Sequence, residues 1–96
     1  MEPAKSDIGI SDVVRSLAGR DRGEWFYVLD ADDTYLMLVN GRDRPVDKPK
    51  RKKRKHVEKV LRSETRVAVK LRSGDKVLNG ELRRDLAFLA RETASE

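Results

Sequence analysis

A succession of short β-prone segments and turn residues constrains the fold of this chain more than any other feature. Segments rich in β-branched and aromatic residues occupy 13–17, 25–29 and 35–39, and each has the length of an ordinary strand. Glycine, aspartate and asparagine, which favour turns, fill the intervals between them. Asn40-Gly41 is the strongest hairpin signal, because a type I′ turn needs a positive φ at both central residues. The pattern therefore predicts antiparallel strands joined by tight turns.

Two further strands are predicted to complete the sheet. A short one lies near residues 44–46 and belongs at an edge, because Pro45 cannot donate a hydrogen bond to a ladder. A closing strand is predicted over residues 56–61. Four or five short strands within about 50 residues are typical of a small barrel or a curled sheet, so the expected fold class is mainly β.

The last third of the chain changes its periodicity and predicts helices. Ser63 is a suitable cap for a helix that runs through Arg72 and ends at Gly74. The alternation over residues 67–71 also fits a strand, so both interpretations stay open for this segment.

A second helix is predicted, with Asn79 as its N-cap. Its apolar residues Leu82, Leu86 and Leu89 recur at helical spacing. Such a stripe is typical of a helix that packs on the rest of the domain, here the barrel. The chain of 96 residues has the length of one domain.

Positive charge is concentrated in one short segment. The net charge of +5 divides into −4 over residues 1–41, +7 over 42–55 and +2 over 56–96. Seven of the eight residues from Lys48 to Lys55 are basic, and such a run repels itself, so it is expected to be an exposed loop. This asymmetry indicates a polyanionic partner held at one defined place.

The sequence contains no motif that would support catalysis or a metal site. It has one histidine, no cysteine, no Gly-x-Ser-x-Gly elbow and no phosphate-binding loop of the Walker type. Asp30, Asp32 and Asp33 lack the spacing of a calcium loop and are interpreted as turn formers. We therefore expect no enzyme activity, no cofactor and no metal.

The sequence contains no apolar run of about 18 residues, so no transmembrane helix is predicted. Residues 1–7 are polar, with no apolar stretch behind them, and are expected to form a flexible leader rather than a signal peptide. The expected location is cytoplasmic, without membrane association.

The loop between the first two strands reads Gly19-Arg20-Asp21-Arg22-Gly23. Glycines without a side chain would let a phosphate approach the loop amides closely. An ordinary hairpin with a charged tip fits the same spacing.

This segment resembles the KOW motif of SH3-like barrels in ribosomal proteins and transcription elongation factors. A valine pair, then Gly-Arg-Asp-x-Gly and an aromatic strand, carry the resemblance. The 28–41 stretch, the basic segment from Pro49 and the tail near residues 71–83 are similar to bacterial KOW-domain RNA-binding proteins. The resemblance covers roughly residues 9–90 and implies an SH3-like barrel over 8–62, with the basic loop 48–55, and a two-helix extension over 63–96.

The resemblance implies binding of structured RNA, most simply ribosomal RNA on the ribosome, and hence a role in translation. The candidate RNA-binding residues are Arg15, Arg20, Arg22, Lys48, Lys50, Arg51, Lys52, Lys53, Arg54, Lys55 and His56. Alternation along the strand places Trp25 and Tyr27 on one face and Phe26 on the other. One face is expected to be core, and Trp25 is a candidate for base stacking as well as for structural packing.

The alternative is a protein-interaction module that docks on a ribosomal or transcription-complex protein. In that case Trp25, Tyr27 and the stripe formed by Leu82, Leu86 and Leu89 would carry the interface.

Overall fold

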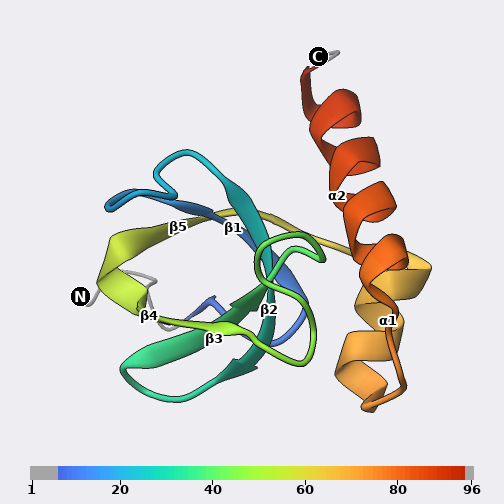
Figure 1. The fold of residues 1–96 in the computed structure, drawn as a ribbon, viewed down its shortest axis with the longest axis horizontal. Coiled ribbons are helices and arrows are strands. Elements are labelled where there is room, and N and C mark those ends of the chain that lie inside the picture. Colours follow the sequence, from blue (N-terminus) through green and yellow to red (C-terminus); the bar gives the residue numbers. More distant parts are fainter. Residues whose placement is uncertain (1–6, 95–96) are drawn as a thin grey trace.

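A five-stranded antiparallel sheet with two helices packed against it makes up the fold (Figure 1). The computed structural model describes residues 7–94, so the expected leader over 1–7 lies outside the described residues except for Asp7. Its strands are β1 (Asp12–Ser16), β2 (Trp25–Ala31), β3 (Tyr35–Val39), β4 (Lys50–Lys53) and β5 (Val57–Arg62). Its helices are α1 (Arg66–Ser73) and α2 (Asn79–Ala94), and the short 3-10 helix η2 (Arg54–His56) joins β4 to β5. The expected mainly β fold class is confirmed.

The two edge strands of the sheet follow each other in the chain. The strand order is β4-β3-β2-β1-β5, and only the three residues of η2 separate the two edges. Because so short a link joins them, the sheet must curl until its edges approach each other at one end. Register shifts at Val13/Val14 and at Val28/Asp30 add bulges that bend the strands further. No pairing joins β4 to β5 in the described chain, so the sheet is curled but not closed.

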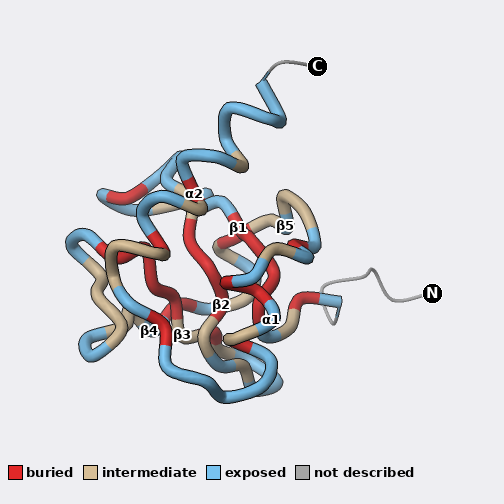
Figure 2. The backbone as a smooth tube through the Cα atoms, turned by 90° about the vertical axis from the view of Figure 1, so that its right-hand side faces the viewer, coloured by how far each residue is buried: buried red, intermediate tan, exposed pale blue. Residues whose placement is uncertain are grey.

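One apolar core lies inside the curled sheet. Its buried members come from four strands and from the segment before β1: Ile8, Val14, Phe26, Val28, Leu36, Leu38 and Val57. Since residues of β3 and β5 belong to one cluster, the curl brings strands from opposite sides of the sheet together. Figure 2 shows this buried backbone running through the strands and exposed backbone around it.

A second core lies between the other face of the sheet and the helices. Val13, Tyr27 and Val39 of the sheet pack there with Ala68 and Leu82 of the helices. Because side chains alternate along a strand, Tyr27 faces the helices while its neighbours face the inner core, as predicted. Both faces of β2 are therefore buried at its centre, not one face alone. Neither helix in residues 7–94 has the length and hydrophobicity of a transmembrane span.

A buried hydroxyl ties α2 to the sheet. The Tyr27 hydroxyl donates to the Asp85 carboxylate of α2, lies 2.8 Å from Ser63 Oγ and lies 3.2 Å from Thr65 Oγ1. Burial, followed by the hydrogen bond to Asp85, raises the pKa of the Tyr27 hydroxyl well above its usual range. The neutral hydroxyl is thus the form that this contact stabilises.

The predicted helix boundaries are nearly right. Thr65 rather than Ser63 caps α1: its Oγ1 accepts from the amide of Ala68, whereas Ser63 Oγ accepts from the amide of Thr65, before the helix begins. Gly74 ends α1 in the left-handed conformation, as predicted. Asn79 is the first residue of α2 rather than its N-cap, because its Oδ1 accepts from the amide of Val46. Glu81 accepts instead from the amide of Leu78, as in a capping box.

The predicted edge strand near residues 44–46 is wrong. The Asn40 side chain accepts from the amides of Arg42 and Arg44, which holds the chain in a turn. The amide of Val46 donates to Asn79 Oδ1 of α2 at 2.8 Å instead of joining a ladder. Asn40 lacks the positive φ that a type I′ turn requires, so Asn40-Gly41 begins a longer loop rather than a two-residue hairpin.

The expectation that residues 48–55 form an exposed loop is also wrong. The fourth strand of the sheet is β4, and η2 follows it, so most of the basic segment has regular structure. Lys52 is buried, with 8% of its surface exposed, and it has a carboxylate partner in Asp21. A run of like charges can form a strand here because a neighbouring loop supplies that carboxylate.

Candidate nucleic-acid interface

The β1–β2 loop exposes two arginines and buries the aspartate between them. The amide of Gly23 donates to the carbonyl of Ser16 at 2.8 Å, which closes the base of the loop. Gly19 and Gly23 have φ values of +87° and +91°, which glycine adopts without the steric cost of a side chain. Arg20 and Arg22 are exposed, whereas Asp21 is buried.

Asp21 joins this loop to β4. Its carboxylate accepts from Lys50 Nζ at 2.7 Å, from Lys52 Nζ at 2.9 Å and from Ser16 Oγ at 2.7 Å. Lys52 Nζ also donates to the carbonyl of Ala18 at 2.8 Å. Burial alone would raise the pKa of the Asp21 carboxyl, but the hydrogen bonds from Lys50, Lys52 and Ser16 outweigh it and hold that pKa well below its usual range. The loop and the basic strand are therefore one unit.

The pleat of β4 divides its cations into two sets. Lys50 and Lys52 point to the side of the buried Leu38 and Leu36, with which they pair, and are bound by Asp21. Arg51 and Lys53 point the other way and are exposed, as expected from the alternation of side chains along a strand. The Arg51 guanidinium lies 3.7 Å from the centre of the Tyr35 ring, a cation–π contact.

The remaining predicted basic residues differ in their surroundings. Arg54 is a structural residue, since its Nε donates to the carbonyl of Asp32 and its Nη1 to that of Ile8, both at 2.8 Å. Lys48 and Lys55 are exposed, and the side chain of neither makes a hydrogen bond or an ion pair within residues 7–94. His56 is half-buried in η2, beside Lys55.

Arg15 is paired with an acidic residue of the neighbouring strand. On β1 it stands opposite Glu58 of β5, and the two side chains form an ion pair. Its charge is compensated there, so it adds little to a surface that attracts anions.

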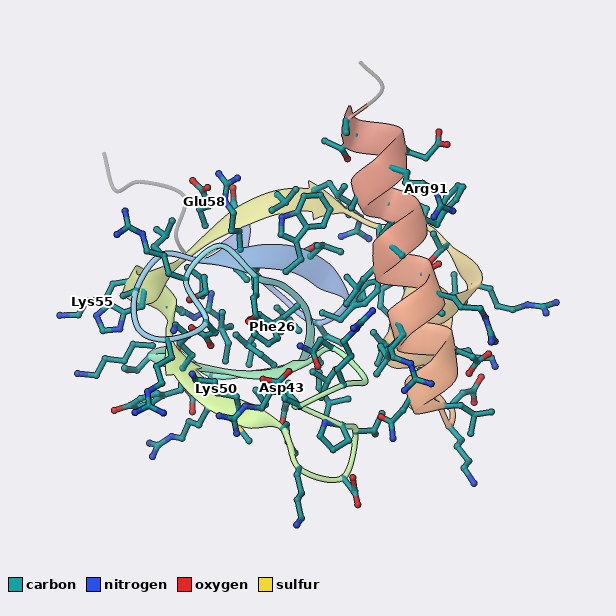
Figure 3. The ribbon with its side chains drawn as sticks, turned by 45° about the horizontal axis from the view of Figure 1, so that its top comes forward. Phe26, Asp43, Lys50, Lys55, Glu58 and Arg91 are labelled. Carbon is teal, nitrogen blue, oxygen red and sulfur yellow. The ribbon has the colours of Figure 1, made fainter. Side chains whose placement is uncertain are left out.

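A second loop with the same four residues lies beside the first. Gly-Arg-Asp-Arg occurs at 19–22 and again at 41–44. A hollow of about 270 Å³ is lined by Arg20, Asp21, Glu24, Asp43, Arg44 and Lys50. Figure 3 shows Asp43 and Lys50 next to each other and Lys55 on the side of the sheet away from α2. Arg42 and Arg44 were missed by the sequence prediction, although the repeated tetrapeptide could have indicated them.

The residues considered for stacking and protein contact are placed on the helical side. Trp25 is half-buried and packs against the core between the sheet and the helices. Leu82 and Leu86 are buried in the same core, and Leu89 packs against it. The leucine stripe therefore packs on the sheet, as its spacing indicated, and does not form an outward-facing interface.

A scan of the chain against protein-family models finds no match, and a search of curated proteins finds none. The resemblance to KOW proteins therefore depends on the motifs in the sequence. The site is defined by its own contacts: the two Gly-Arg-Asp-Arg loops and the outward cations of β4 and η2.

Proposed function

We propose that this protein binds structured RNA, with ribosomal RNA on the ribosome as its target. The observation that carries the proposal is the pairing of Asp21 with Lys50 and Lys52. This pairing joins the β1–β2 loop to β4 and leaves Arg20 and Arg22 exposed beside the strand. The cationic surface is the outward set of basic side chains on these elements: Arg20, Arg22, Arg42, Arg44, Arg51, Lys53 and Lys55.

The charge balance of this surface favours a polyanion. Arg51 stacks on Tyr35, and the charged groups of the other six side chains make no hydrogen bond or ion pair within residues 7–94. Four arginines on two loops offer planar forks that bind phosphate oxygens in pairs. Phosphate contacts fix the position of a protein on RNA but carry no sequence information, so we expect binding with little base preference from this surface.

The fold is consistent with the proposed family. We infer that the curled sheet is the SH3-like barrel of KOW proteins. Five short antiparallel strands, one enclosed core and sequential edge strands joined by η2 support this inference. The Gly-Arg-Asp-Arg-Gly loop occupies the β1–β2 connection, where the resemblance requires the motif.

A binding assay with a labelled RNA hairpin tests the proposal. R51Q/K53Q/K55Q removes three outward cations and should weaken binding at low salt by at least about tenfold, through lost phosphate contacts. R66Q/K76Q/R84Q removes the same charge from exposed residues around the helices and should leave the affinity within about threefold. Equal losses in both variants, or none in either, would show that this surface does not bind RNA.

Sedimentation with ribosomes separates RNA contact from protein docking. We expect co-sedimentation that is lost after RNase treatment or at high salt. Co-sedimentation that survives both treatments would support docking on a protein instead.

A further inference from the structure

A larger hollow lies next to the cationic surface and is lined by apolar and acidic side chains as well as by arginines. It measures about 440 Å³ and lies between the start of β2, the 40–44 loop and α2. Trp25 and Leu86 contribute apolar surface, Glu24 and Asp43 contribute carboxylates, and Arg42 and Arg83 contribute guanidinium groups. We propose that this hollow receives one unpaired base of the bound RNA, a base with an amino group, guanine above all. This inference rests on the proposed RNA-binding function.

The apolar part of the hollow suits an aromatic ring. Trp25 is only half-buried, although the three residues that follow it in β2 are buried. Its indole N–H makes no hydrogen bond within residues 7–94, so the group stays available to a ligand. Leu86, at the end of the helix-covered core, lies beside it. A base stacked on an indole ring gains favourable contact whatever its identity.

The carboxylates determine which group can enter. Phosphate is disfavoured between Glu24 and Asp43, because like charges repel. A base edge with N–H donors fits them, and carboxylates accept from amino groups of bases. Guanine offers two adjacent donors, N1–H and the 2-amino group, whereas uracil has a single ring N–H. The Glu24 carboxylate has no hydrogen bond or ion pair within the described chain, and one oxygen of the Asp43 carboxylate accepts from Asn40 Nδ2 at 3.0 Å.

The arginines at the rim connect the hollow to the phosphate-binding surface. Arg83 Nη1 donates to the carbonyl of Gly41 at 2.7 Å, which fixes the 40–44 loop against α2. Arg42 is exposed and makes no ion pair within residues 7–94. Glu24 and Asp43 also line the smaller hollow that contains Arg20 and Arg44. A nucleotide whose base enters the larger hollow therefore has cations on both sides for its phosphates.

Fluorescence can follow this site directly, because Trp25 is the one tryptophan of the chain. The probes are a 5′-labelled hexauridylate and the same RNA with one guanosine at a central position. Anisotropy of the label measures the affinity, and Trp25 emission measures contact with the hollow. We expect the guanosine RNA to quench Trp25 and to bind about five- to tenfold more tightly than hexauridylate, as one stacked base would.

Three variants make the test specific. W25L should abolish the guanosine preference, and E24Q, an exposed substitution that leaves the fold intact, should reduce it several-fold. Y35L removes an aromatic side chain that does not line the hollow and should keep the preference.

The outcomes separate this inference from the proposed function. Salt-dependent binding of both RNAs with equal affinity and unchanged Trp25 emission would overturn the base site and leave RNA binding in place. Absence of binding to either RNA would overturn both. Binding of guanosine monophosphate as tight as that of the RNA would also overturn the inference, since the hollow would then be a site for free nucleotides.

Discussion

At the scale of single residues, Asp21 has the largest influence on the candidate site. Its carboxylate is the one anion between Lys50 and Lys52 in the described contacts. Without it, Lys52 would keep a charge in a place where only 8% of its side chain is exposed. A buried charge that loses its partner is strongly destabilising. The same holds in reverse, because replacing residues 50 to 55 would leave the buried Asp21 carboxylate without Lys50 and Lys52. Such a replacement would destabilise the fold as well as remove the surface cations.

D21N should lower the free energy of unfolding at pH 7 by about 3 kcal/mol, since it removes one partner of a buried ion pair. Folding lowers the pKa of this carboxyl, so its stabilisation is complete above the ordinary value of about 3.8 and is lost as the pH falls below it. Urea unfolding at pH 7, 5 and 3 should show a difference between wild type and D21N that begins to shrink at pH 3.

The exposed Asp33 provides the control for this experiment. D33N removes a carboxylate with no hydrogen bond or ion pair in residues 7–94, so it should change stability by less than about 0.5 kcal/mol. A cost for D21N no greater than that of D33N would contradict the role given to Asp21.

At the scale of secondary-structure elements, the sequence predicted the type of most elements but not the use of the basic segment. β2 and β3 contain continuous apolar runs, Trp25–Leu29 and Tyr35–Val39, and such short runs between turn residues locate strands well. β4 has no apolar residue at all, because its sequence is Lys50-Arg51-Lys52-Lys53. Its inward positions are filled by lysines that reach a carboxylate 29 and 31 residues earlier in the chain. No local pattern carries that information, so the strand could not be predicted.

The site was predictable to a similar extent. The glycines of the first loop and the charge density of the segment indicated which elements would be involved. Which cations point outward depends on the register of β4 against β3. The second Gly-Arg-Asp-Arg loop became significant only when the fold placed it beside the first.

The close contact between the 40–44 loop and α2 requires a glycine at residue 41. A Cβ at Gly41 would lie 2.3 Å from the backbone carbonyl oxygen of Asn79, and its φ is +78°. G41A should therefore cost about 3 kcal/mol, from the clash and from the left-handed backbone. Gly23 has a φ of +91° with nothing within 4 Å, so G23A should cost only about 1–2 kcal/mol. Thermal unfolding of both variants measures the two losses of stability. Equal losses would show that the contact between the 40–44 loop and α2 tolerates a side chain at residue 41.

At the scale of the whole molecule, the fold neutralises part of the basic segment inside the structure and exposes the rest of its positive charge at one end of the sheet. The +7 of residues 42–55 is partly compensated inside the structure, where Lys50 and Lys52 meet Asp21. The outward cations of β4 and η2 lie at the opposite end of the sheet from α1 and α2 (Figure 1). An RNA that approaches this end meets positive charge without the acidic residues of the helices.

The salt dependence of binding measures how many of these cations contact phosphate. If about six phosphates are neutralised, log K should fall against log[salt] with a slope near −4 to −5. R51Q/K53Q/K55Q should make the slope less negative by about 2 to 3, one phosphate contact being lost for each cation. R66Q/K76Q/R84Q should leave the slope unchanged within about 1, because its cations lie around the helices. A lower affinity with an unchanged slope in the first variant would mean that the three residues shape the surface without contacting phosphate. The phosphates would then be bound by the arginines of the two Gly-Arg-Asp-Arg loops, and R20Q/R22Q should reduce the slope instead.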